Sequence, residues 1–214
     1  MTGLLSGLFY WMTAKKAGVF VKVIPSVEFF PRGSDGPFIG NFPMNRTQLE
    51  HILRAAGSVS GSREIVVIGS QAILASYPDA PSELLKSMEA DVYPLDVPEK
   101  ADLIDGCIGE LSPFHETFGY YAHGVSPDTA TLPRGWRSRL VKLENQNTEG
   151  TVGWCLAPVD LAASKLVAGR EKDLDFVRGM FRVGILSKLA VRKVFEELIP
   201  DQASVAGNNL ESCV

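Results

Sequence analysis

Hydrophobic positions first recur with a helical period shortly after residue 44. The side chains spaced to form one apolar helical face are Leu49, Ile52, Leu53 and Ala56. Just ahead of them, Thr47 and Glu50 have the spacing of a capping box, which marks the start of a helix. The pattern therefore predicts that the folded domain begins with a helix at about Met44. That the native chain starts at Met44 is a hypothesis.

A strand, a tight turn and a helix are predicted next. Residues 64–68 form a short β-branched run, which is typical of a strand buried on both faces. Gly69 and Ser70 end this run, and residues 71–76 have a helix-like pattern. Strand character resumes over residues 88–93.

The rest of the chain predicts a mixed sheet followed by helices. Pro, Gly and Asn separate further strand candidates at 118–123, 139–144 and 151–156, which suggests an antiparallel portion of the sheet. Helices are expected over 82–86, 99–108, 158–168, 171–183 and 187–198. Gly169 and Gly184 are placed to end two of these helices, and the tail after Pro200 is predicted to be disordered.

The first 43 residues have a different character. Glycine and aromatic residues mix there without a sustained period, so we expect an extension outside the core. Its apolar run over 4–12 is too short to span a bilayer. The nearest positive charges follow this run instead of preceding it, unlike in a secretory signal. We therefore expect no membrane partner.

Composition narrows the class of protein. A chain of 214 residues with 45% hydrophobic content fits one domain with a packed core. The net charge of -4 argues against a surface built for tight, non-specific nucleic-acid binding. The three cysteines lack metal-site spacing and indicate reduced thiols. These features predict a soluble, cytoplasmic protein.

Two carboxylates are predicted to lie side by side on the strand at 88–93. Side chains alternate along a strand, so Glu89 and Asp91 share one face. Like charges this close are unfavourable unless a cation or a proton separates them. Magnesium suits such oxygen ligands, particularly when substrate phosphates complete its coordination shell.

The Gly69-Ser70 turn is predicted to bind phosphate. Gly69 has no side chain to block the approach of a phosphate to the backbone, and Ser70 offers a hydroxyl. The amides at the start of the following helix would favour an anion. Either half of this constellation alone is common, since Gly-Ser is more often a simple turn and Glu-x-Asp occurs on many solvated strands.

Four segments in order resemble the nucleotidyltransferase superfamily, in particular a branch of poorly characterised bacterial members. They also resemble, more distantly, the nucleotidyltransferase toxins of abortive-infection toxin–antitoxin systems. The segments are Val67–Leu74, Ser87–Tyr93, Asp160–Lys165 with its Asp-x4-Lys spacing, and Gly169–Asp175. The resemblance implies an α/β (α+β) fold, with a mixed β-sheet flanked by helices over residues 44–156 and a helical C-terminal section over 157–200.

The resemblance also implies roles for three basic residues. Lys165 would contact phosphate or act as a base toward the acceptor, while Arg170 and Lys172 would clamp the triphosphate. The structural alternatives are a helix cap at Asp160 with a solvated lysine, and an exposed, mixed-charge helix start. The aromatic surroundings of His123 favour packing over catalysis.

This sequence departs from the superfamily pattern at three points. Glu89 stands where the superfamily usually has Asp, and the gap from Gly69 to Glu89 is longer than in many members. The third carboxylate has no obvious counterpart. Glu144 is our candidate metal ligand for that position, with Asp173 or Asp175 as alternatives.

The expected activity is transfer of a nucleoside monophosphate from a nucleoside triphosphate to an acceptor hydroxyl, with magnesium as cofactor. The acceptor stays open between RNA, protein and a small molecule. The alternative is a non-catalytic scaffold that binds a nucleotide or a protein partner, including a role as a toxin–antitoxin component, and Glu89 favours this alternative.

Overall fold

The computed structural model describes residues 43–214 and two short strands ahead of them. These strands, β1 (Met12–Thr13) and β2 (Phe20–Val21), pair in antiparallel fashion. The chain divides into two compact units, Met1–Gly40 and Asn41–Val214. Apart from β1 and β2, the predicted N-terminal extension lies outside the described residues.

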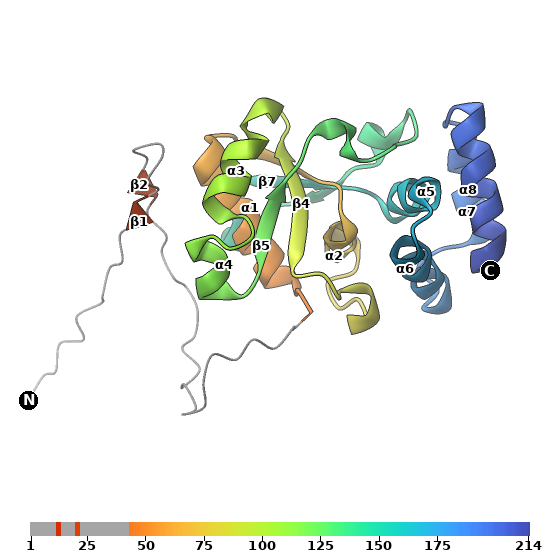
Figure 1. Ribbon diagram of the computed structural model, residues 1–214, viewed down its shortest axis with the longest axis horizontal. Helices are drawn as coiled ribbons and strands as arrows, with labels where there is room; N and C mark the ends of the chain where they lie inside the picture. The colour runs from red at the N-terminus through yellow and green to blue at the C-terminus, as the bar shows by residue number, and fades with distance from the viewer. Residues whose placement is uncertain (1–11, 14–19, 22–42) are drawn as a thin grey trace, which may run out of the picture. The chain divides into compact units, whose positions relative to one another are not determined.

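A five-stranded mixed sheet forms the centre of the larger unit (Figure 1). Its strands, in spatial order, are β5 (Tyr121–Gly124), β4 (Glu89–Pro94), β3 (Glu64–Val67), β7 (Val152–Cys155) and β6 (Val141–Leu143). The pairs β3–β7 and β4–β5 are parallel, whereas β3–β4 and β6–β7 are antiparallel. The predicted α/β fold with a mixed sheet is confirmed.

Helices α1 (Arg46–Ser60) and α3 (Ala101–Ile108) pack together and against the sheet. The apolar face predicted for the first helix is fully buried in this packing. The predicted capping box is wrong by two residues, because Asn45 caps α1 and Gln48 bonds back to its amide. Asparagine is a strong N-cap, so the helix starts before Thr47.

The C-terminal helices gather beyond the sheet, on the side away from α3 (Figure 1). They are α5 (Pro158–Ala168), α6 (Glu171–Arg182), α7 (Lys188–Phe195) and α8 (Pro200–Cys213), and α5 packs against the other three. The predicted disordered tail is wrong. Pro200 begins α8, and Ala206 and Leu210, four residues apart, are fully buried on one helical face.

Two other segments differ from the prediction. The helix α4 (Pro113–Phe118) occupies part of the region read as a strand, because Ser112 caps it and Gly119 ends it in a left-handed conformation. The helix expected over 71–76 is split into a 3-10 turn, η1 (Ser70–Ala72), and one α-turn, α2 (Ile73–Ser76). Further 3-10 turns are η2 (Ser82–Leu84), η3 (Pro98–Lys100), η4 (Pro127–Thr129), η5 (Trp136–Arg139) and η6 (Gln146–Thr148).

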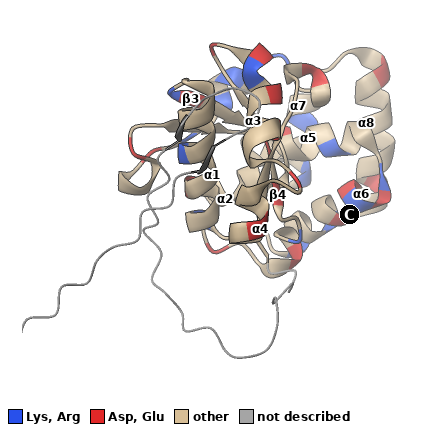
Figure 2. Ribbon diagram, turned by 60° about the vertical axis from the view of Figure 1, so that its left-hand side comes forward, with Lys and Arg blue, Asp and Glu red and all other residues tan. Residues whose placement is uncertain are grey.

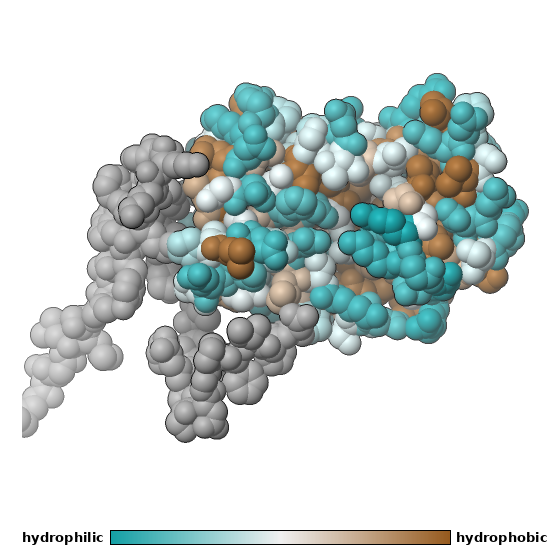
Figure 3. Space-filling view, viewed as in Figure 1, coloured by the Kyte–Doolittle hydropathy of each residue, from teal (hydrophilic) through white to brown (hydrophobic). Residues whose placement is uncertain are grey.

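On the face of the molecule shown in Figure 3, hydrophilic residues dominate and apolar residues lie among them in small groups. This distribution is usual for a folded surface, where single exposed apolar side chains are normal. Among the described residues, no helix combines the length and the apolar character needed to cross a membrane.

Candidate functional site

The turn after β3 lies directly against one of the two predicted carboxylates. The Ile68 amide donates a hydrogen bond to the Asp91 carbonyl at 3.0 Å. A Cβ atom at Gly69 would collide with the Asp91 carboxylate. The missing side chain at residue 69 therefore makes room for Asp91, in addition to any ligand.

Glu89 and Asp91 lie on one face of β4, as predicted. Ala90 and Val92, between and beyond them, are fully buried on the other face. Burial raises the pKa of Asp91 above its usual value, and the charge of Glu89 raises it further, while His123 and Lys165 partly offset the rise. The pair therefore forms a site where a cation would be stabilised.

Each carboxylate has a partner on the neighbouring strand β5. The parallel register places Tyr121 opposite Glu89 and His123 opposite Asp91. The Tyr121 hydroxyl donates to Oε2 of Glu89 at 3.1 Å, and Nδ1 of His123 donates to Oδ1 of Asp91 at 3.0 Å. These bonds fix the orientation of both acids.

Two basic side chains from the C-terminal helices meet on a buried carboxylate. Nζ of Lys165 lies 2.9 Å from Oδ1 of Asp173, and Nε of Arg170 lies 2.5 Å from Oδ2. The Lys165 ammonium also sits 4.8 Å above the centre of the Phe176 ring. Both of its contacts stabilise a cation. This arrangement suits a phosphate contact better than a base.

Asp91, Lys165, Arg170 and Asp173 line one pocket of about 130 Å³, whereas Glu89, Tyr121 and His123 do not line it. Its walls contain Ile68, Gly69, Asp91, Thr129, Ala130, Thr131, Leu161, Ser164, Lys165, Ala168, Arg170 and Asp173. Figure 2 shows acidic positions in red on β4 and a basic position in blue on α5, the elements that carry Asp91 and Lys165. The pocket therefore brings Gly69, Asp91, Lys165 and Arg170 together, as the predicted site requires.

Other predicted site residues lie outside this pocket. Ser70 begins η1 without lining the pocket, and a three-residue 3-10 turn has little dipole to attract an anion. Lys172 is exposed on α6, whereas Arg170 and Asp173 reach the pocket. The expected Arg170–Lys172 clamp is thus reduced to Arg170.

The structure contradicts Glu144 as the third carboxylate. β6 runs antiparallel to β7, so Val141 pairs with Cys155 near the pocket. Glu144 follows Leu143 and therefore lies toward the other end of these strands, away from the pocket. There Glu144 forms an ion pair with Lys142. Among the alternatives, Asp175 is exposed and bonds Arg178, while Asp173 does line the pocket.

Asp160, the first residue of the Asp-x4-Lys segment, is neither a cap nor a pocket residue. Its carboxylate is fully buried and accepts hydrogen bonds from Arg139, the shortest being 2.9 Å from Nε and 2.7 Å from Nη2. Arg139 also bonds Glu197 near the end of α7. Asp160 therefore fixes the segment before β6 to the C-terminal helices.

The sequence interpretation assigned His123 to packing, and it gave no role to Tyr121 or to the wall at 129–131. The alternation of Tyr121 and His123 was visible and implies a shared strand face. Which strand would pair with theirs was not visible, because register between distant strands depends on the folded sheet.

The donor set fits a hard divalent cation only in part. Glu89 and Asp91 supply carboxylate oxygens, but the described residues contain no cluster of three or more His, Cys, Asp or Glu side chains able to hold a metal ion. Magnesium commonly binds through one or two carboxylates with substrate phosphates and water. The pair fits that mode, in which the nucleotide completes the site.

Comparison with known proteins adds one match. A family described as "Nucleotidyltransferase of unknown function (DUF6036)" matches residues 47–206, which is more than half of the chain and includes every residue of the pocket. No curated protein and no solved structure matches the sequence significantly.

Proposed function

The chain belongs to the nucleotidyltransferase family DUF6036, and from this premise we propose that it transfers a nucleoside monophosphate from a nucleoside triphosphate to an acceptor hydroxyl. One observation carries the proposal. Asp91 and the cations Lys165 and Arg170 line one pocket with the Gly69 turn. Nucleotidyl transfer needs this combination of an acidic, metal-binding side and a basic, phosphate-binding side.

In the proposed reaction, the acceptor oxygen attacks the α-phosphorus while the bond to the β-phosphate oxygen breaks and pyrophosphate leaves. Glu89 and Asp91 would hold magnesium, which neutralises charge on the phosphates when it is bound. Lys165 and Arg170 would bind phosphate oxygens, since both present cationic donors to the pocket. Tyr121 and His123 would orient the two acids.

Asp173 would hold the two phosphate-binding cations of the pocket in place. Its buried carboxylate binds Lys165 and Arg170 together, so the two cations are held near each other despite their mutual repulsion. An incoming phosphate would bind the donors of Lys165 and Arg170 that Asp173 does not use. Asp173 is thus better placed to position these cations than to act as the third metal ligand.

A second candidate function is nucleotide binding without turnover. The observation that favours it is that Glu89 is already bonded to Tyr121 and Asp91 to His123, without a third carboxylate on the metal side. Such a site would bind a nucleotide and present it, or the adjacent helices, to a protein partner. Magnesium-dependent binding without pyrophosphate release would distinguish this function from transfer.

A thermal-shift titration tests the proposed site. The purified chain is titrated with ATP, GTP, CTP and UTP, in magnesium or in chelator, alongside Asp91→Asn and Lys165→Met. Lys172→Met is the matched control, because Lys172 is exposed outside the pocket. A ligand at one hundred times its Kd should stabilise the fold by about 2.7 kcal/mol.

We expect a magnesium-dependent rise in Tm for the wild-type chain and the Lys172→Met control. The rise should shrink or vanish in Asp91→Asn and Lys165→Met. Each variant is compared with its own ligand-free Tm, so that changes in intrinsic stability do not count. If no nucleotide raises the wild-type Tm, or if all three variants respond equally, the proposed site is wrong.

A further inference from the structure

A second pocket lies at the opposite end of strands β3 and β7 from the nucleotidyltransferase site. β3 ends at Val67, shortly before Gly69 in that site, and begins at Glu64, next to Arg63. The parallel strand β7 begins just after Thr151. The residues that line this second pocket, here called the arginine pocket, are Arg54, Gly57, Ser58, Gly61, Ser62, Arg63, Glu149, Gly150 and Thr151. It shares no residue with the first pocket.

The size and lining of the arginine pocket suit a small polar molecule. Its volume is about 500 Å³, within the usual range for ligand sites of roughly 300–1,000 Å³. The side chains that line it come from arginine, serine, threonine and glutamate, and three glycines leave backbone amides accessible. A polar ligand is therefore favoured over an apolar one.

Two guanidinium groups give the pocket a basic character. Arg63 is exposed, and its guanidinium forms no hydrogen bond or ion pair with the described part of the chain. Arg54 donates to the Asn147 carbonyl at 2.7 Å and lies 3.8 Å from Glu149, the only acidic lining residue. The Glu149 side chain is 55% exposed, so its pairing with Arg54 is weak and easily exchanged.

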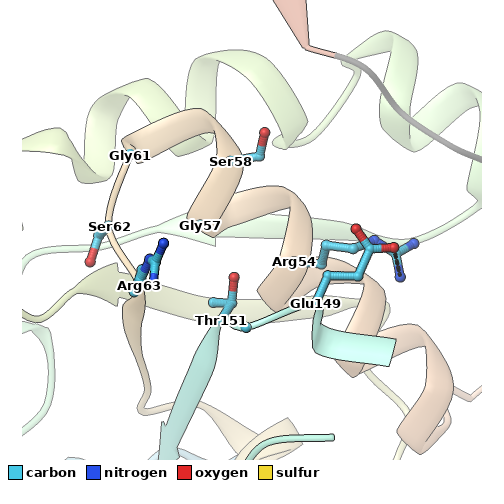
Figure 4. A pocket seen from close by; sticks show the side chains of 9 residues that line it. Arg54, Gly57, Ser58, Gly61, Ser62, Arg63, Glu149 and Thr151 are labelled. Carbon is cyan, nitrogen blue, oxygen red and sulfur yellow. Dashed lines mark ion pairs between the residues drawn. The ribbon is translucent and has the colours of Figure 1, made fainter. Parts of the chain in front are cut away.

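Thr151 supplies a hydroxyl that is open to the arginine pocket. The residue is only 7% exposed, and its hydroxyl has no hydrogen-bond partner among the described residues. Figure 4 shows this hydroxyl and the Arg63 guanidinium directed toward the same space below the last turns of α1. A Cβ at Gly57 would collide with the Thr151 side chain, so the glycine makes room for the threonine beside α1. The hydroxyl is therefore free to bond a ligand in the pocket.

The end of α1 does not cancel this basic character. Its C-terminal carbonyls would repel an anion, but several have partners. Lys100 donates to the Ser60 carbonyl at 2.7 Å, the Gly61 amide to Gly57, and the Ser60 hydroxyl to Ala56. The arginines therefore dominate the electrostatics of the pocket.

We propose that the arginine pocket binds the phosphate group of a small anionic molecule, between Arg63 and Thr151 and within reach of Arg54. Guanidinium groups bind phosphate through paired, charge-assisted hydrogen bonds, and the Thr151 hydroxyl adds one more donor. The proposal concerns a ligand site separate from the nucleotidyltransferase pocket, and it holds whether or not the chain is an active transferase.

The test is a titration of the full chain, labelled with ¹⁵N, with inorganic phosphate and with adenosine 5′-monophosphate, followed by NMR. The amides of Gly57, Gly61 and Gly150 report on the pocket. The variants are Arg63→Gln and Thr151→Val, with Arg182→Gln as a control for removal of an exposed arginine elsewhere. Lys165→Met removes phosphate binding at the other pocket, and each variant's Tm checks its folding.

We expect saturable shifts of the three glycine amides in the wild type, Lys165→Met and Arg182→Gln. Arg63→Gln should raise the Kd about tenfold or more. Thr151→Val should raise it about fivefold, which is the effect of one lost hydrogen bond. A response to phosphate alone would identify an inorganic ion, and a tighter response to the nucleotide a phosphate monoester. Shifts that do not saturate, shifts that survive Arg63→Gln, or tighter binding of a single-stranded RNA would overturn the proposal.

Discussion

His123 donates a hydrogen bond to Asp91 across two parallel strands, with 3.0 Å between Nδ1 and Oδ1. The strands place these residues directly opposite each other, so the contact follows from the backbone register. The Asp91 side chain is about one quarter exposed and that of His123 one half. His123 thus orients the acid while leaving its second oxygen toward the pocket.

Replacing His123 should weaken the metal side of the site. We expect His123→Ala to lower magnesium affinity or transfer activity about 10- to 100-fold, as is typical when the partner of a metal ligand is removed. Because His123 offsets part of the raised pKa of Asp91, its loss should also move the acid limb of activity to higher pH. A pH profile of activity measures both effects. His123→Asn, which keeps a donor, should recover part of the loss, and an unchanged profile in His123→Ala would contradict this role.

Asp91→Asn should make the ligand-free protein more stable while it abolishes activity. The pKa of Asp91 is raised in the fold, chiefly by burial and then by Glu89, so folding favours the protonated acid. Stability from this group is therefore present below the ordinary Asp pKa of about 3.9 and is lost as pH rises through the higher folded value. Asparagine does not ionise, so Asp91→Asn does not lose this stability as pH rises. Urea unfolding at pH 8 and pH 4 should show a gain that shrinks at pH 4; a destabilised variant at pH 8 would refute the argument.

Gly69→Ala should impair transfer without unfolding the protein. The new Cβ would collide with the Asp91 carboxylate and displace it from the pocket. Because a misplacement of about 1 Å can cost about 100-fold in rate, we expect a loss of that order in kcat/KM. Gly106→Ala is the matched control, since its Cβ would meet nothing within 4 Å. Equal activity in both variants would show that the close approach of Gly69 to Asp91 is unimportant.

Much of the site could be predicted because it depends on local patterns. The strand just before Gly69 and the alternation of Glu89 and Asp91 are properties of short segments, and the structure confirms both. The short spacing from Lys165 to Arg170 likewise brought two cations to neighbouring helices.

What could not be predicted depends on contacts between distant segments. The pairing of β4 with β5 decides that His123 faces Asp91, and the antiparallel direction of β6 decides that Glu144 lies away from them. For α8 the signal was present, since Ala206, Leu210 and Cys213 have helical spacing. Low overall hydrophobicity hid this pattern, and packing against α5 supplies the stability.

Asp173→Asn should destabilise the fold at neutral pH. Burial would raise the pKa of Asp173, but hydrogen bonds from Arg170 and Lys165 outweigh it, so the pKa lies below its usual value. The stabilisation is present above the ordinary Asp pKa and is lost as pH falls through the lowered folded value. We expect a loss of about 3 kcal/mol at pH 7, as for a broken buried ion pair. Urea unfolding should show the two proteins converging below pH 4, and a constant difference would exclude the carboxylate charge as its cause.

Asp160 and Arg139 should be strongly coupled, although neither is expected to touch the nucleotide. Arg139→Met leaves the fully buried Asp160 carboxylate without its cation and should cost about 3 to 5 kcal/mol. Arg139→Met combined with Asp160→Leu removes both charges and should recover much of this loss, since apolar replacement of a buried pair is often neutral. Glu197 contributes less, because its side chain is about one third exposed.

A double-mutant cycle on unfolding free energies measures this coupling. Arg139 holds the segment that follows the 129–131 wall, so Arg139→Met should also weaken nucleotide binding, and the double variant should restore stability better than binding. Additive effects of the two substitutions would show that the Asp-x4-Lys aspartate does not act through Arg139.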